Sequence, residues 1–101
     1  MSLTNKNKLN FIEIIKNELS QFNEINKVIL FGSFIDSNTP NDIDIAVVQN
    51  SNENYLTLSL KYRKVLRNLS KIIPLDIVPI KIDTNGAFMS EINNGQIVYE
   101  K

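Results

Sequence analysis

Three short apolar runs, separated by longer segments with helical periodicity, constrain the fold of this chain more than any other feature. Val28–Phe31 ends abruptly at a Gly-Ser pair, residues 42–48 read Asp-Ile-Asp-Ile-Ala-Val-Val, and residues 75–80 read Leu-Asp-Ile-Val-Pro-Ile. Runs of this length are typical of strands, and the unbroken first run predicts a strand buried on both faces. Pro79 cannot donate to a strand ladder, so it fits near a strand end or at a sheet edge.

Helical segments alternate with these runs. Apolar residues recur with a period of about 3.6, which predicts amphipathic helices over 8–22 and from about 51–54 to 71. The two stripes are Leu9, Ile12, Ile15, Leu19 and Phe22, then Leu58, Tyr62, Val65, Leu66 and Leu69. A short helix over 83–92 and a last strand over 96–99 complete the order. We therefore expect an α+β fold, with a mixed sheet of about four strands flanked by helices.

Length and composition exclude several classes of protein. The 101 residues have room for one core, so we expect a single domain over 1–101. The absence of cysteine and histidine excludes a disulfide framework, a thiolate zinc site and imidazole catalysis. A net charge of zero argues against direct nucleic-acid binding. Without a signal core or a run of membrane-spanning length, we expect a cytoplasmic protein with no membrane partner.

Two aspartates at the start of the second strand are candidate metal ligands. Side chains alternate along a strand, so Asp42 and Asp44 share a face, with Cα atoms roughly 6.6 Å apart, while Ile43, Ile45 and Val47 face the core. Two carboxylates on one face repel each other unless a cation lies between them. Such a pair can bracket two hard cations about 3.5–4 Å apart, and oxygen-only ligation suits Mg²⁺ or Mn²⁺.

A third acid and a Gly-Ser turn extend this candidate site. Asp76 lies inside an apolar run, where a lone buried carboxylate is costly and should have a partner; on a neighbouring strand it would complete a triad with Asp42 and Asp44. Gly32 permits close approach of a ligand to the backbone, and N–H groups at a turn entering a helix bind anions. The Ser33 hydroxyl adds a donor.

Each of these residues also has a purely structural interpretation. Asp42 and Asp44 could form a solvated strand face, and Asp76 could be a buried structural acid paired with arginine or a backbone cap. Gly32 could be an ordinary turn glycine and Ser33 a helix cap. The order of strand, Gly-Ser turn, Asp-x-Asp and third Asp favours a site over any of these features taken alone.

Three motifs together resemble a known family. Residues 31–34 read Phe-Gly-Ser-Phe, residues 41–47 read Asn-Asp-Ile-Asp-Ile-Ala-Val, and residues 75–78 read Leu-Asp-Ile-Val. This ordered set resembles the minimal nucleotidyltransferases of the DNA polymerase β superfamily, which are relatives of kanamycin nucleotidyltransferase. The resemblance extends over about Val28 to Tyr99 and implies the polymerase β-like nucleotidyltransferase fold.

The resemblance implies a role for each motif residue. Asp42 and Asp44 would ligate two Mg²⁺ ions, with Mn²⁺ as a possible substitute. Asp76 would bind the catalytic metal and help activate an acceptor hydroxyl. Gly32 and Ser33 would hold the β- and γ-phosphates of ATP or another nucleoside triphosphate. The hydroxyl would attack the α-phosphorus, which transfers a nucleoside monophosphate and releases pyrophosphate.

The segment after the Gly-Ser pair departs from the family pattern. Many members carry a basic residue and a second glycine there, whereas residues 34–38 read Phe-Ile-Asp-Ser-Asn, and the loop to the Asp pair is shorter. Replacing a cation by Asp36 should weaken phosphate binding by about 1–3 kcal/mol. Basic residues of the second predicted helix could compensate or simply form a solvated face: Lys61, Arg63, Lys64, Arg67 and Lys71.

The resemblance also implies a partner. Minimal domains of this kind are often paired with a small helical HEPN protein in toxin–antitoxin modules, which implies an antitoxin that transfers AMP to a hydroxyl of that partner. The sequence reaches Lys101 directly after the last predicted strand, so we expect another molecule to supply the acceptor. One alternative is a catalytically weak or inactive module that neutralises a toxin by occlusion. A nucleotidyltransferase acting on a small molecule is another alternative.

Overall fold

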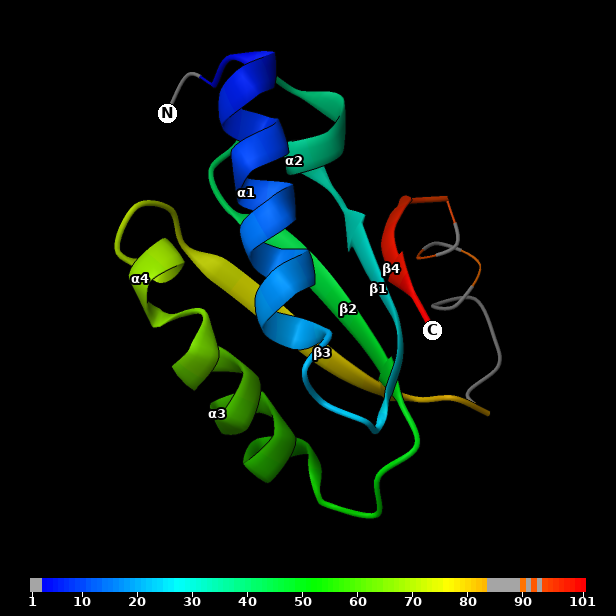
Figure 1. The fold of residues 1–101 in the computed structure, drawn as a ribbon. Coiled ribbons are helices and arrows are strands. Elements are labelled where there is room, and N and C mark those ends of the chain that lie inside the picture. Colours follow the sequence, from blue (N-terminus) through cyan, green and yellow to red (C-terminus); the bar gives the residue numbers. More distant parts are fainter. Residues whose placement is uncertain (1–2, 84–89, 91, 93) are drawn as a thin grey trace.

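A four-stranded sheet forms the centre of the computed structural model, which describes residues 3–83, 90, 92 and 94–101 (Figure 1). The strands lie in the order β3-β2-β1-β4. β1 is antiparallel to both β2 and β4, whereas β2 and β3 are parallel. The predicted mixed sheet of four strands is therefore confirmed. The bounds are β1 Ile25–Phe31, β2 Ile43–Gln49, β3 Leu75–Lys81 and β4 Gln96–Glu100.

The first helix, α1 (Asn5–Leu19), begins and ends three residues earlier than its apolar pattern predicted. Thr4 caps it, because its hydroxyl accepts a hydrogen bond from the Asn7 N–H and the Asn7 side chain accepts one from the Thr4 N–H. This reciprocal capping satisfies two N–H groups at the helix start. Polar capping residues, rather than the apolar stripe, therefore determine where this helix begins.

The buried face of α1 differs in part from the predicted stripe. Phe11, Ile15 and Leu19, each four residues apart, are buried against the sheet. The prediction for Leu9 is wrong, since 62% of this residue is exposed. At 3.6 residues per turn, Leu9 lies about 200° around the helix from Phe11, so both cannot face the core.

The predicted second helix is divided into α3 (Tyr55–Val65) and α4 (Arg67–Ser70). Asn54 caps α3, and its side-chain oxygen accepts a hydrogen bond from the Thr57 N–H at 2.8 Å. Leu66 interrupts the helix with φ −102° and ψ 14°. The predicted apolar face is nevertheless retained, because its main members are buried: Leu58, Tyr62, Leu66 and Leu69.

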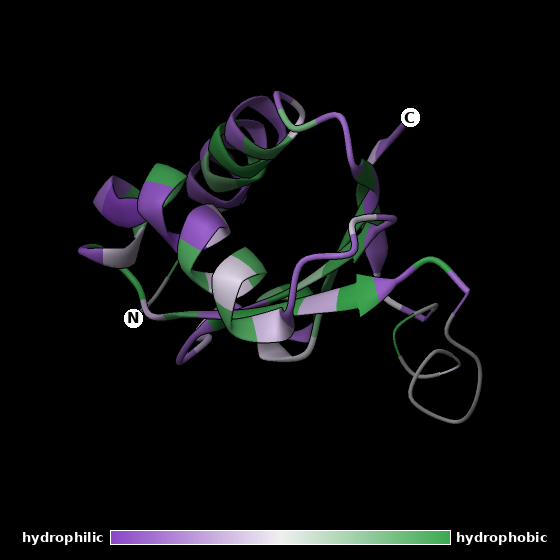
Figure 2. Ribbon diagram, turned by 90° about the horizontal axis from the view of Figure 1, so that it is seen from below, coloured by the Kyte–Doolittle hydropathy of each residue, from purple (hydrophilic) through white to green (hydrophobic). Residues whose placement is uncertain are grey.

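The sheet separates two apolar clusters. The larger cluster lies between the sheet and helices α1, α3 and α4, and it includes Ile43, Ile45 and Val47 as predicted. The opposite face carries a smaller cluster of Ile29, Ala46, Val48, Ile80 and Ile92. The helices thus cover one side of the sheet, whose central strands are mainly hydrophobic (Figures 1 and 2). The prediction that β1 is buried on both faces is confirmed, because the residues at its centre are fully buried.

The outer edge of β3 is protected by side chains from α3. Arg63 donates a hydrogen bond from Nη1 to the Leu75 carbonyl oxygen at 3.2 Å, and the Tyr55 hydroxyl lies 3.5 Å from the Ile77 carbonyl oxygen. Pro79, two residues further along the same edge, has no N–H to leave unpaired. The prediction of Pro79 at a sheet edge is confirmed. These features reduce the ability of the edge to pair with another strand.

The remaining predictions concern the C-terminal part and membranes. The predicted last strand is confirmed as β4. The helix predicted over 83–92 falls largely outside the described residues. In the part of the chain that the structure describes, no helix has the length and apolar character needed to cross a membrane.

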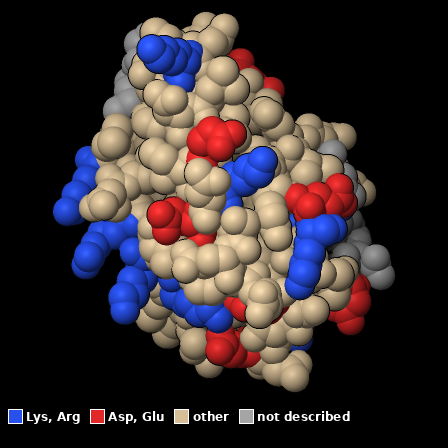
Figure 3. Space-filling model, viewed as in Figure 1, with Lys and Arg blue, Asp and Glu red and all other residues tan. Residues whose placement is uncertain are grey.

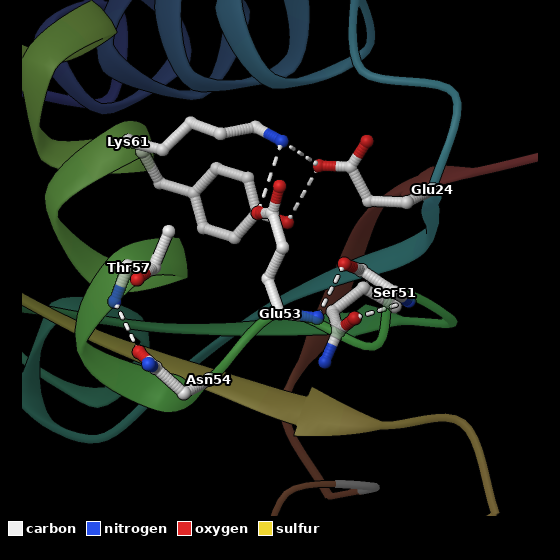
Figure 4. A network of polar contacts seen from close by, with 8 residues as sticks. Glu24, Ser51, Glu53, Asn54, Thr57 and Lys61 are labelled. Carbon is white, nitrogen blue, oxygen red and sulfur yellow. Dashed lines mark hydrogen bonds and ion pairs between the residues drawn. The ribbon is translucent and has the colours of Figure 1, made fainter.

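A cluster of charged side chains joins the start of β1 to α3 (Figure 4). Glu24 Oε2 accepts a hydrogen bond from the Tyr62 hydroxyl at 3.0 Å and lies 2.9 Å from Lys61 Nζ. Lys61 Nζ also lies 3.6 Å from Glu53 Oε2. Burial alone would raise the pKa of Glu24, but hydrogen bonds from Lys61, its own backbone and Tyr62 together outweigh burial and lower this pKa below its ordinary value.

This cluster predicts an acid-sensitive contribution to stability. The ordinary pKa of Glu24 is 4.5. Because the pKa is lower in the folded state, the charged carboxylate stabilises the fold at pH values above 4.5, and this contribution is lost as pH falls through the folded-state pKa. We expect Glu24→Gln to destabilise the protein by about 1 kcal/mol at pH 7, because the pair is partly screened by solvent. Urea denaturation at pH 7 and pH 3 measures this difference, which should nearly vanish at pH 3. An equal loss at both values would contradict the proposed ionic role.

Candidate active site

The predicted site residues gather at one end of the sheet, where β1 ends and β2 and β3 begin. Phe31 pairs with Asp44 across the antiparallel strands, and Gly32 follows Phe31 directly. Asp44 pairs with Asp76 across the parallel strands. Because paired residues of adjacent strands point to the same face, the two carboxylates lie side by side. The prediction that the strand bearing Asp76 lies beside the strand bearing the Asp pair is confirmed.

The prediction that Asp76 is a buried charge is wrong. Its side chain is exposed, whereas Leu75 and Ile77 on either side of it are buried. Leu75 and Ile77 belong to the larger apolar cluster, so Asp76 points to the opposite face of the sheet. There it lies at the start of β3, outside the smaller cluster that covers Val78 and Ile80. Water therefore stabilises the Asp76 charge, and strand register rather than the cost of burial places it beside Asp44.

Asp44 is the electrostatic centre of the acidic residues. Its side chain is partly buried at the start of β2. Burial raises the pKa of the Asp44 carboxyl, and the negative charges of Asp42 and Asp76 raise it further. The charges of Asp42 and Asp76 therefore act on Asp44. Asp76 lies on β3, whereas Asp42 directly precedes β2 (Ile43–Gln49). A cation at this end of the sheet would relieve their repulsion.

The acidic residues are the right type of ligand for a hard cation, but their side chains are not positioned to coordinate one ion together. Across residues 3–83, 90, 92 and 94–101, no three acidic side chains come together closely enough to hold an ion. All the donors are carboxylate oxygens, the ligand type that Mg²⁺ and Mn²⁺ prefer. A bound cation would also offset the repulsion by Asp42 and Asp76 that contributes to the raised pKa of Asp44. Side-chain rotation would therefore have to draw Asp42 and Asp76 toward Asp44.

Gly32 occupies a backbone conformation that the site requires. Its φ of 76° and ψ of −154° lie in a region that is essentially restricted to glycine. A Cβ atom at this position would lie 2.2 Å from Asp44 Oδ2. The turn therefore requires glycine both for its backbone conformation and for the close approach of the Asp44 carboxylate. The predicted close approach of a ligand to Gly32 stays a prediction.

A hollow of about 340 Å³ opens beside Gly32 and Asp44. This volume is at the lower end of the range for small-molecule sites. Asp36 also borders the hollow, so this acid lies at the candidate site. Ser33 begins the short helix α2 (Ser33–Asp36) and is exposed at the mouth of the turn. The full lining of the hollow is Phe31, Gly32, Ile35, Asp36, Asp44, Asn94 and Gly95.

Asn94 and Gly95 were not predicted as site residues. They precede β4, which pairs with β1 and so brings them to the same end of the sheet. A Cβ atom on Gly95 would lie 2.3 Å from the Leu30 carbonyl oxygen. The sequence signal is the Asn-Gly pair, which is typical of a turn, but its distance along the chain from Gly32 concealed the contact.

The class of protein that this fold and site define is the nucleotidyltransferase domain. The defining features are a mixed sheet, an acid pair, a third acid on the adjacent strand and a Gly-Ser turn. The family model described as Polymerase beta, Nucleotidyltransferase matches residues 13–101 of the chain. The chain therefore belongs to the polymerase β nucleotidyltransferase family. No curated protein matches the sequence.

Solved structures share this fold at low sequence identity. A mutant of the toxin–antitoxin pair MntA–HpeT matches with a TM-score of 0.54 and 14% identity, over 94% of this chain and 74% of the other. A proposed nucleotidyltransferase from Sulfolobus solfataricus matches with a TM-score of 0.53 and 17% identity, over 93% and 84%. The E. coli CdnC–HORMA complex matches with 0.53 and 19%, over 84% of this chain but 38% of the other. At these identities the likeness concerns the fold.

The contact between Gly32 and Asp44 predicts coupled effects of two substitutions. We expect Gly32→Ala to destabilise the protein by about 1–3 kcal/mol, because alanine tolerates neither the backbone conformation nor the close carboxylate. In an Asp44→Ala background the carboxylate is absent, so only the backbone strain should remain and the loss should be smaller. Thermal unfolding of the four proteins of the cycle measures the coupling. Equal costs of Gly32→Ala in both backgrounds would exclude the contact.

The raised pKa of Asp44 predicts that its charge destabilises the metal-free fold. For an acid with a raised folded-state pKa, the cost to stability develops as pH rises through the ordinary pKa, 3.8 for Asp44, and is complete above the folded-state pKa. The cost is therefore present at pH 7 and disappears on acidification. We expect Asp44→Asn to raise the free energy of unfolding by about 0.5 kcal/mol at pH 7 in EDTA, a modest gain because solvent screens the charges. Denaturant titrations in EDTA test this, and a loss of stability at pH 7 would show that the charge is compensated.

Proposed function

We propose that the protein is a metal-dependent nucleotidyltransferase that transfers AMP from ATP to a hydroxyl group of a partner protein. The observation that carries this proposal is the pairing of Asp44 with Asp76 directly beside the Gly32 turn and its hollow. Phosphate binding, metal ligation and deprotonation of an acceptor need groups of these types within one small region. Family membership supports nucleotidyl transfer in general, and the choice of ATP and of a protein acceptor belongs to the proposal.

In this proposal each residue of the site has a definite task. Asp42 and Asp44 would hold two Mg²⁺ ions, with Mn²⁺ as a substitute and Asp76 as a further ligand of the catalytic ion, and the ions would supply charge neutralisation at the phosphates. The Gly32 and Ser33 N–H groups and the Ser33 hydroxyl bind the β- and γ-phosphates. Asp76 takes the proton from the acceptor hydroxyl, whose oxygen forms a bond to the α-phosphorus as the bond to pyrophosphate breaks. The exposure of Asp76 leaves it within reach of a hydroxyl on another molecule.

We further propose that the partner is a helical HEPN-type toxin and that this chain is its antitoxin. The similar structure of MntA–HpeT is that of a toxin–antitoxin pair, and the CdnC structure is also a complex with a second protein. The position of Asp76 on an edge strand supports an acceptor that approaches from outside the domain. Modification of a hydroxyl in the toxin would then neutralise it.

A second candidate function retains the partner and omits the chemistry. Asp36 places an additional negative charge at the hollow where phosphates would bind, and in the described part of the chain no three acids are closed around one point. Both observations favour weak nucleotide binding. In this alternative the domain neutralises its partner by occlusion, and the acidic residues contribute nothing to the interaction.

Labelled ATP distinguishes the two candidates. We expect the wild-type protein, incubated with Mg²⁺, labelled ATP and the purified product of the neighbouring reading frame, to transfer the label to that product. Asp42→Ala should reduce transfer by at least a hundredfold, because one shared metal ligand is lost. Asp83→Ala is the matched control, since it removes an exposed acid that follows the far end of β3.

Thermal stability gives a readout that does not depend on the acceptor. Saturation with Mg²⁺-ATP at 100 times its Kd should stabilise the wild type by about 2.7 kcal/mol, and Asp42→Ala should remove this effect. If neither label transfer nor a thermal shift occurs with the wild type at millimolar ATP, while the partner is still bound, the occlusion mechanism replaces the enzymatic one.

A further inference from the structure

The outer face of α3 carries an apolar patch that the fold does not use. Leu56 and Leu60, one helical turn apart, are 66% and 58% exposed. They lie on the side of the helix opposite Leu58 and Tyr62, which are buried against the sheet. Residues four apart on a helix are neighbours, so the two leucines form one continuous patch.

A basic hollow follows this patch directly. Arg63, Lys64 and Arg67 surround a space of about 350 Å³, together with Ser70 and Leu75. Figure 3 shows Lys and Arg side chains gathered on the side of the molecule where α3 and α4 lie. Among the described residues, the basic members of ion pairs are Lys27 and Lys61, so no carboxylate balances the charges of the hollow there.

We propose that this combined surface, which we call the α3 face (Leu56, Leu60, Arg63, Lys64 and Arg67), docks a protein segment that carries apolar side chains followed by acidic ones. Charge complementarity determines the acidic part of the docked segment. The three cations, which have no acidic partner among the described residues, attract carboxylates and repel basic segments. The two exposed leucines determine the apolar part of the docked segment, since their burial in a complex removes hydrocarbon surface from water.

A protein segment fits this face better than a nucleic acid. Single-stranded nucleic acids are bound by grooves that combine cations with aromatic rings on which bases stack. The α3 face presents leucines beside its cations, and the tyrosine at the start of the helix, Tyr55, directs its hydroxyl to the Ile77 carbonyl oxygen. The net charge of zero also provides little of the long-range attraction on which nucleic-acid binding depends.

The α3 face adjoins the candidate active site across the edge strand. Leu75 lines the basic hollow, and the next residue along β3 is Asp76. Their side chains point to opposite faces of the sheet, so a protein seated on the α3 face extends around the edge of β3 to reach Asp76. Because Arg63 already occupies the Leu75 carbonyl oxygen, docking uses side chains and not addition of a strand. That the docked protein is also the acceptor rests on the proposed function.

A peptide probe tests docking separately from catalysis. The probe is a helical peptide of about 16 residues, with two leucines four positions apart followed by three glutamates, and its control has glutamine for each glutamate. We expect fluorescence anisotropy at low salt to show binding of the acidic peptide that is at least tenfold tighter than that of the control. Lys64→Glu with Arg67→Glu should weaken acidic-peptide binding at least tenfold, and Leu56→Ser with Leu60→Ser should also weaken it. Arg63 is left unchanged because it caps the edge of β3.

Matched controls separate the outcomes. Lys6→Glu with Lys16→Glu changes the net charge equally at exposed positions of α1 and should leave peptide binding unchanged. The protein with Lys64→Glu and Arg67→Glu should still be stabilised by Mg²⁺-ATP. If Mg²⁺-ATP does not stabilise the wild type, the proposed function is overturned, but the docking result is unaffected. Equal binding of the acidic and glutamine peptides, or tighter binding of a single-stranded RNA than of the acidic peptide, would overturn the docking proposal.

Discussion

The parallel pairing of β2 with β3 is the constraint on which the rest of this structure depends. It makes β2 an interior strand, so Ile43, Ile45 and Val47 pack under the helices while Ala46 and Val48 pack on the opposite face. A parallel pair requires a crossover, and α3 and α4 supply it. The same register places Asp44 beside Asp76. One pairing thus produces both the core and the concentration of charge at its end.

Two features at that end of the sheet constrain the stability of the fold. Gly32 adopts a conformation that costs free energy in any other residue, and it does so against the Asp44 carboxylate. Burial and two neighbouring charges raise the pKa of that carboxyl in the absence of a cation. A turn that only glycine can form without strain and a carboxyl group with a raised pKa are both features that are enriched at functional sites. The ionic cluster at Glu24, beside the start of β1, is in contrast mutually favourable and supports the packing of α3.

Many features of the fold were predictable because they depend on local pattern. The apolar runs located β1, β2 and β3, and the 3.6-residue period located the helices to within a few residues. The errors occurred where a nonlocal fact decided the outcome. The exposure of Leu9 follows from which side of α1 faces the sheet. The exposure of Asp76 follows from the extent of the smaller apolar cluster, which covers Val78 and Ile80 on the same face of β3 but not the start of the strand.

The sequence by itself determined the types of group available for chemistry: three aspartates, a Gly-Ser turn, and neither cysteine nor histidine. Alternation along a strand also predicted that Asp42 and Asp44 share a face, although the structure places Asp42 directly before β2, which begins at Ile43. Only the tertiary structure decided that Asp44 lies against Gly32, that Asp36 and Gly95 border the same hollow, and that the cations of α3 and α4 surround a separate one. The physical reason is that strand register and helix docking bring together residues far apart in the chain, whereas periodicity and propensity describe only neighbours.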